Sequence, residues 1–196
     1  MPLLDNDRSR PHPLGGNYAA GDKYLCHTSD IRAPLGRAQV QSETDFIQLA
    51  IRLATENVRS GVGGPFGAVV VRNGEIVATG VNRVTSDNDP TAHAEVNAIR
   101  EACKALGTFQ LPGCVLYTSC EPCPMCLGAI YWSRLDTVYF GNTCHDAAEI
   151  GFDDHFIYEE LAVPREQRKM PMVRLLPELA IESFRAWQEH QSKIAY

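Results

Sequence analysis

Four residues in two short motifs have the types and spacing needed to hold a metal ion and to move a proton. His93 and Glu95 are separated by one residue, and Cys123 and Cys126 by two, with a proline directly before Cys123. Residues three apart on a helix share one face, so the two sulfur atoms can bind one ion together. We expect each motif to start a helix, where unpaired backbone N–H groups favour a thiolate over a thiol.

The number of ligands indicates what kind of metal site this is. His93, Cys123 and Cys126 supply three ligands, whereas structural zinc normally has four and catalytic zinc leaves its fourth position to water. In favourable sites zinc lowers the pKa of a bound water from about 15.7 to near 7. Glu95 is placed to take that proton and to pass it to a ring nitrogen and then to a leaving amine. The sequence therefore predicts one catalytic Zn²⁺ per subunit, with Glu95 as a catalytic residue.

Each motif alone permits other interpretations. A Cys-x-x-Cys pair can be a redox centre or half of a structural metal site. Cys120, Cys123 and Cys126 also begin like a ferredoxin cluster-binding run, which needs a further cysteine where this chain has Ile130. We interpret Cys120 as a buried neighbour of the metal ligands.

Charge and composition narrow the partners. The chain has 196 residues, of which 44% are hydrophobic, a composition typical of a soluble protein with one core. Its 18 basic and 24 acidic side chains give a net charge of −6, which argues against general nucleic-acid binding and favours a small substrate. No apolar run is long enough to span a membrane. The first residues lack the apolar stretch of a secretory signal, so we expect a cytoplasmic protein.

The elements that must position the motifs follow from the hydrophobic pattern. The pattern predicts helix, strand, strand, helix, strand, helix and strand in that order, with an Asn-Gly turn between the first two strands. This order predicts a mixed sheet covered by helices on both faces, which is a three-layer α/β/α domain. Both motif helices follow strands, so their N-termini can lie close together at the C-terminal ends of those strands. The expected ranges are 42–61, 66–72, 75–82, 94–106, 115–118, 123–134 and 137–141.

The two ends of the chain differ from this core. Residues 1–41 lack a clear period and are interpreted as an irregular N-terminal extension, so the domain covers 42–196. After about residue 145 we expect a polar loop, a short helix near 156–161, a strand at 173–176 and a final helix from Glu178. These last residues form an addition to a core that is already closed.

The motifs resemble those of a known superfamily. The stretches 63–68, 88–95 and 117–132 are similar to the zinc nucleobase deaminases of the cytidine-deaminase fold, whose signature pairs H-x-E with P-C-x-x-C. The tRNA adenosine deaminases carry a very similar cysteine motif, so these stretches indicate the superfamily alone. The residues 151–158 and a final Tyr196 resemble the bacterial guanine deaminases, and this resemblance extends from about residue 44 to the C-terminus.

The resemblance implies hydrolysis of guanine at C2 to xanthine and ammonia. It also implies a homodimer in which the segment 145–196 is exchanged between subunits and closes the partner's active site. Transferred to this chain, it assigns recognition of the base to Asn82, Asp154 and Tyr196, and the lining of the pocket to Phe66 and Trp132. An Asn side chain offers both a donor and an acceptor, a carboxylate accepts from N–H groups, and aromatic rings stack on a flat base.

Other roles fit these residues as well. Asp154 can be a loop or cap residue, and Tyr196 a solvated terminus. Phe66 and Trp132 can be ordinary core aromatics. Glu159 is a candidate second catalytic carboxylate, although it can equally face solvent on a helix.

Two other functions remain open at this point. A tRNA adenosine deaminase would share the zinc motifs and would need a basic stripe around its cleft. A non-enzymatic binding protein stabilised by zinc would have no use for a proton carrier at Glu95.

Overall fold

Four strands form one mixed sheet at the centre of the computed structural model, which describes residues 42–196. β1 (Gly67–Arg72) lies between β2 (Glu75–Val81) and β3 (Cys114–Cys120), and β4 (Thr137–Asn142) is the edge strand next to β3. β1 is antiparallel to both of its neighbours, whereas β3 and β4 are parallel. The Asn-Gly turn joins β1 to β2 with positive φ at both residues, as predicted.

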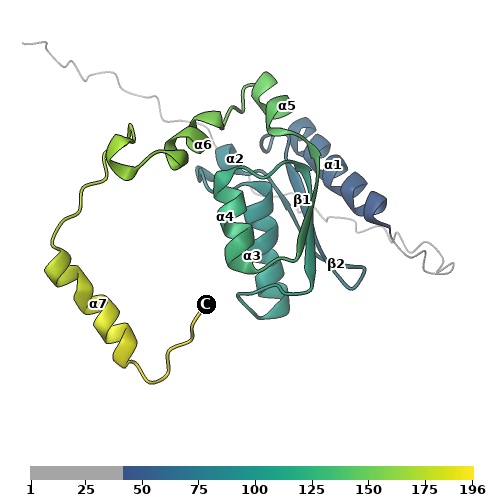
Figure 1. Cartoon of the computed structure of the whole chain (residues 1–196). Helices are drawn as coiled ribbons and strands as arrows, with labels where there is room; N and C mark the ends of the chain where they lie inside the picture. The colour runs from purple at the N-terminus through teal and green to yellow at the C-terminus, as the bar shows by residue number, and fades with distance from the viewer. Residues whose placement is uncertain (1–41) are drawn as a thin grey trace, which may run out of the picture. The chain divides into compact units, whose positions relative to one another are not determined.

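Helices cover both faces of this sheet (Figure 1). α1 (Glu43–Arg59) packs against β1 and β3 on one face. α3 (Ala94–Leu106) packs against β2 and β1 on the other face, where it lies beside α4 (Pro124–Ser133). Alternate residues of β1 enter the two halves of the core, Val70 on the α3 side and Val69 on the α1 side. The predicted three-layer α/β/α architecture is confirmed.

Local sequence sets the start of each layer helix. Ser42 and Asp45 form the expected capping box at the start of α1. α3 begins directly after His93 and ends at Gly107, which has a φ of 64°. Gly80 of β2 lets the first turn of α3 approach the sheet, because a Cβ there would lie 2.2 Å from the Ala94 oxygen.

The chain beyond β4 differs from the expectation in two places. Residues expected as a polar loop form α5 (Cys144–Glu149), because Thr143 and Asp146 make a second capping box. The strand expected at 173–176 is wrong, since residues 171–176 have no regular structure. These residues are mostly apolar, but no described strand pairs with them, and an unpaired strand leaves its backbone groups unsatisfied. The other elements are α2 (Val84–Asp87), α6 (His155–Ala162), the 3₁₀ helix η1 (Arg165–Gln167) and α7 (Pro177–Glu189).

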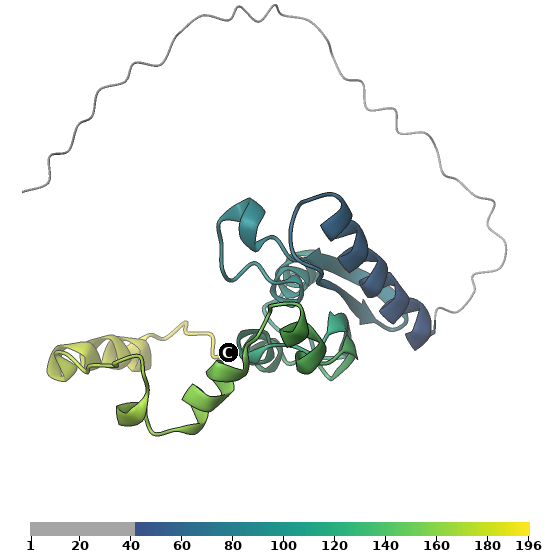
Figure 2. The same cartoon turned by 90° about the horizontal axis from the view of Figure 1, so that it is seen from above.

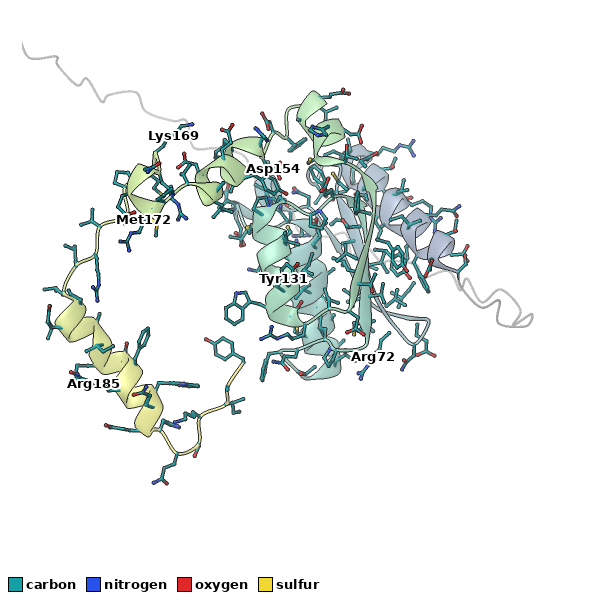
Figure 3. All side chains as sticks on the ribbon, in the orientation of Figure 1. Arg72, Tyr131, Asp154, Lys169, Met172 and Arg185 are labelled. Carbon is teal, nitrogen blue, oxygen red and sulfur yellow. The ribbon has the colours of Figure 1, made fainter. Side chains whose placement is uncertain are left out.

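Residues 163–196 form an extended arm, which we call the C-terminal arm. Figures 1 and 2 show α7 apart from the sheet, and none of its residues is buried. Lys169, Met172 and Arg185 mark the course of the arm in Figure 3. Its large apolar side chains are exposed, including Leu179, Phe184 and Trp187. Among residues 42–196 no helix is long and apolar enough to cross a membrane, and the expected extension at 1–41 lies outside the described residues.

Candidate active site

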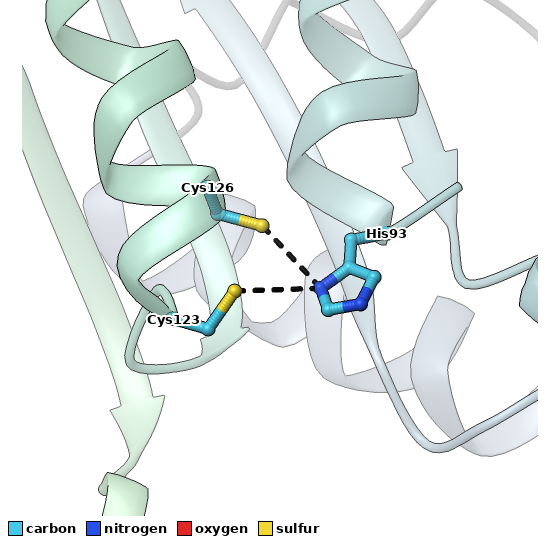
Figure 4. A group of neighbouring side chains, drawn as sticks. All are labelled: His93, Cys123 and Cys126. Atoms are coloured by element: carbon cyan, nitrogen blue, oxygen red, sulfur yellow. Dashed lines mark hydrogen bonds between the residues drawn. The ribbon is translucent and has the colours of Figure 1, made fainter. Parts of the chain in front are cut away.

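The two motif helices bring His93, Cys123 and Cys126 together (Figure 4). His93 Nδ1 lies 3.6 Å from Cys123 Sγ and 3.5 Å from Cys126 Sγ. The three ligand atoms all lie within 4.8 Å of one another. An imidazole nitrogen with two sulfur atoms at this spacing is a donor set that fits Zn²⁺, as the sequence predicts.

Hydrogen bonds between the two thiols shift their pKa values in opposite directions. The Cys126 thiol donates a hydrogen bond to Cys123, which lowers the pKa of Cys123 to about 4 and raises the pKa of Cys126. The hydrogen bond with Cys123 raises the pKa of the His93 imidazole. The chemistry of the three groups is therefore coupled, and a bound cation would replace the protons that they share.

Cys120 does not belong to this group. It is buried, and its thiol donates to the Thr143 carbonyl at 3.6 Å. Burial raises the pKa of Cys120 to about 11, so it stays a neutral thiol. The interpretation of Cys120 as a buried neighbour is confirmed.

Glu95 lies in the first turn of α3 and is 5% exposed. Burial raises the pKa of its carboxyl group, with the nearby Cys123 acting in the same direction. A carboxyl group whose neutral form is favoured in this way is suited to accept a proton and to release it again.

A cavity of about 340 Å³ opens beside the metal group. This volume falls in the range of sites for small molecules, roughly 300–1,000 Å³. Of the residues that the sequence assigns to the site, the cavity is lined by Phe66, Asn82, His93, Glu95, Cys123 and Asp154.

Asn82 is buried at the end of β2, and its side-chain oxygen lies 3.3 Å from both the Gly64 and Val84 backbone nitrogens. Phe66 lines the cavity and makes an edge-to-face contact with Phe152, with ring centroids 5.0 Å apart. Phe152 was not among the site residues predicted from the sequence. The Gly-Phe-Asp-Asp stretch that contains it was the available signal.

Asp154 reaches the cavity from the start of α6, where it occupies the N-cap position without a side-chain cap bond. Partial burial raises the pKa of its carboxyl group, and the neighbouring Cys123 adds to the effect. Because the carboxylate does not cap the helix, it is available to bind a ligand in the cavity.

Three further candidates lie outside the cavity lining within one chain. Trp132 and Tyr196 contact each other, with ring centroids 5.9 Å apart, and Phe109 also contacts Tyr196. Both Trp132 and Tyr196 are more than half exposed. Glu159 lies on an exposed part of α6, 3.4 Å from His155.

Comparison with known proteins places this geometry in a family. The family model described as the cytidine and deoxycytidylate deaminase zinc-binding region matches residues 40–142. The chain belongs to this family of zinc-dependent deaminases. The match contains both motifs, and the group of His93, Cys123 and Cys126 fits the zinc ion of this family.

Individual relatives distinguish branches of the family. The deaminase is 54% identical over 151 residues to guanine deaminase of Bacillus subtilis (strain 168), which covers 77% of this chain and 97% of the relative. A crystal structure of guanine deaminase from Bacillus subtilis matches with a TM-score of 0.78 and 52% identity, over 80% of this chain and 99% of that one. The tRNA-specific adenosine deaminase of the same strain is 53% identical over 77 residues, 39% of this chain and 48% of the relative.

Proposed function

We propose that this deaminase hydrolyses guanine to xanthine and ammonia. The observation that carries the proposal is the group of His93, Cys123 and Cys126, which borders the same cavity as the buried carboxyl group of Glu95. The similarity to a guanine deaminase over nearly the full length of that relative supports the choice of substrate.

The residues of the chain divide the chemistry between them. When bound, Zn²⁺ supplies a nucleophile from water at neutral pH. Glu95 accepts the proton that this water loses, passes it to a ring nitrogen of the base, and so prepares the C2–N bond for cleavage. Glu95 then takes up the proton of the new C2 hydroxyl group and delivers it to the exocyclic amine, which leaves as ammonia while the C2 carbonyl forms.

The base would be recognised by residues of the cavity wall. Asp154 is suited to accept from the N–H edge of guanine, and Asn82 to bond a polar atom on another edge. Phe66, supported by Phe152, offers an apolar ring for stacking. A site that satisfies these polar edges rejects bases that lack them by large factors.

A tRNA substrate is the second candidate, and two observations disfavour it. The match to the tRNA-specific adenosine deaminase of Bacillus subtilis covers 39% of this chain, whereas the match to the guanine deaminase covers 77%. Residues 42–162 carry seven basic and sixteen acidic side chains, which repel a phosphate backbone.

We propose further that two copies form a homodimer by exchanging the C-terminal arm. The arm exposes apolar side chains that a single chain leaves uncovered, including Leu175, Phe184 and Trp187. It carries six basic and four acidic side chains, opposite in sign to the acidic residues 42–162. The sequence-based expectation exchanged the whole segment 145–196, but Asp154 lines the cavity of its own chain. Exchange of the C-terminal arm alone would bring Tyr196 to the partner's cavity, beside the partner's copy of α4. A catalytic role for Glu159 and a cytoplasmic location stay predictions of the sequence.

The test of the activity uses the zinc-loaded protein with guanine, adenine, cytosine and guanosine. We expect xanthine and ammonia from guanine alone among the four. If guanine is not converted while zinc fills the site, the proposal is wrong, and inosine formed in a tRNA stem-loop would support the second candidate.

Glu95→Gln separates an enzyme from a zinc-stabilised binding protein. The substitution keeps the shape of the side chain but removes the proton acceptor, so we expect roughly a 100- to 10,000-fold loss of turnover. Zinc content should stay at the wild-type level. An enzyme that keeps its rate with this substitution would exclude Glu95 as the proton carrier.

A further inference from the structure

A buried asparagine on α1 connects two backbone segments at the cavity. Asn57 is 5% exposed and lies on the face of α1 that packs toward the sheet. Its Nδ2 group donates to the Gly64 carbonyl at 2.9 Å and to the Asn82 carbonyl at 2.8 Å. Asn57 itself does not line the cavity, whereas Gly64 and Asn82 do.

The segment that Asn57 holds also determines which way the Asn82 side chain points. Backbone N–H groups only donate, so the two amides of Gly64 and Val84 at 3.3 Å must meet the Oδ1 atom of Asn82. The opposite orientation would set the side-chain NH₂ group against two N–H donors. The Nδ2 group is therefore the part of Asn82 that remains for a ligand.

Close packing leaves the two segments little freedom. A Cβ atom on Gly63 would lie 2.1 Å from the Asn82 backbone oxygen and 3.1 Å from Asn57 Nδ2. The chain thus passes against Asn82 with no side chain between them. The two bonds from Asn57 are the side-chain hydrogen bonds that tie this contact to α1.

We propose that Asn57 is a positioning residue that fixes Asn82 as a hydrogen-bond donor, so that the site selects bases with an acceptor atom at this edge. The inference rests on the proposed function, because it takes the cavity to be the base-binding site. It narrows the sequence-based expectation for Asn82, which allowed both a donor and an acceptor.

The test compares guanine with three analogues that each lose or weaken one acceptor. These are 3-deazaguanine and 7-deazaguanine, in which carbon replaces N3 or N7, and 6-thioguanine, in which the weaker acceptor sulfur replaces O6 and N1 keeps its hydrogen. In the wild type, the analogue altered at the acceptor for Asn82 should bind about tenfold more weakly than guanine. In Asn57→Ala, KM for guanine should rise about tenfold with zinc retained, whereas binding of that same analogue should not change.

Asn82→Ala identifies the analogue independently. The substitution should leave binding of the same analogue unchanged. Adding Asn57→Ala to it should not weaken guanine binding further, because both substitutions remove the same interaction. Leu111→Ala is the matched control, since Leu111 is fully buried and does not line the cavity. It should lower Tm without changing the ratio between guanine and any analogue.

Two outcomes would overturn the proposal. One is an equal loss for guanine and all three analogues in Asn57→Ala, which is what a purely structural role would cause. The other is a loss of guanine binding in the double variant that equals the product of the losses in the two single variants. If Asn57→Ala fails to fold, Asn57→Leu keeps nearly the same side-chain shape, removes the donors without adding a charge, and is judged by the same two outcomes.

A ligand-free measurement separates this inference from the proposed function. The Gly64 and Val84 amide protons should exchange with deuterium faster in Asn57→Ala than in Leu111→Ala. Unchanged exchange would contradict the positioning role even if guanine is the substrate. Faster exchange in a protein that does not convert guanine would support the positioning of Asn82 and reject the substrate.

Discussion

The metal ligands occupy equivalent places on two helices. His93 is the N-cap of α3 and Cys123 is the N-cap of α4, with Cys126 in the first turn of α4. Both helix N-termini therefore face the same point, and their unpaired N–H groups favour negative charge there. Cys120 is the last residue of β3 and lies on neither helix. Its thiol donates to the Thr143 carbonyl.

This difference between neighbouring cysteines predicts their effects on metal binding. Cys123→Ala removes one of three ligands, so zinc content should fall from one ion per chain to nearly none. Cys120→Ala should retain a full complement, because its thiol is not a ligand. Zinc content is measured by atomic absorption on protein purified without added metal. Loss of zinc in Cys120→Ala would show that the thiol takes part in the site.

Two helices, α1 and α5, begin with capping boxes, and only α5 lines the cavity. Ser42 and Asp45 start α1, and Thr143 and Asp146 start α5. In both boxes, hydrogen bonds to the capping residue lower the pKa of the aspartate. A lowered folded-state pKa means that this stabilisation is present at neutral pH and is lost as the pH falls through that pKa. α5 also contributes Cys144 to the cavity wall, whereas no residue of α1 lines the cavity.

The matched substitutions Ser42→Ala and Thr143→Ala separate stability from activity. Each should lower the free energy of unfolding by about 1 kcal/mol, because each removes the side-chain cap of one helix. Only Thr143→Ala should also reduce guanine turnover, since it loosens an element of the cavity. Denaturant unfolding and steady-state kinetics measure the two effects. Equal kinetics in the two variants would show that α5 does not shape the site.

At the scale of the whole molecule, the C-terminal arm is the part that one chain leaves unpacked. α7 buries none of its residues, although Leu179, Phe184 and Trp187 are large and apolar. Apolar area of this kind is stabilised when another surface covers it. The arm ends in Tyr196, one of the residues that the sequence assigns to the site.

Complementation tests whether the arm serves a partner's site. Glu95→Gln has an intact arm and a defective site, whereas deletion of residues 193–196 leaves an intact site without the arm's end. Each variant alone should be nearly inactive. If arms are exchanged, a mixed dimer holds one complete site, and coexpression should restore up to about one quarter of wild-type activity. A mixture as inactive as its parts would mean that each arm serves its own chain.

Features that depend on neighbours along the chain could be predicted from the sequence. Helical spacing predicted α1, the Asn-Gly pair predicted the turn between β1 and β2, and the cysteine spacing predicted a shared face. These signals are local, so they can be recognised from residues close together in the sequence. The strand expected at 173–176 failed for the opposite reason, since a strand needs a partner that residues nearby in sequence do not supply.

The tertiary structure decided which predicted residues meet. It placed Asp154 on the cavity although it lies 59 positions after Glu95 in the sequence, and it left Glu159 on an exposed surface. It also settled the orientation of Asn82, because the amides of Gly64 and Val84 take its oxygen. A side chain's hydrogen-bond partners come from segments that only folding brings together, so residue type alone cannot choose between donor and acceptor.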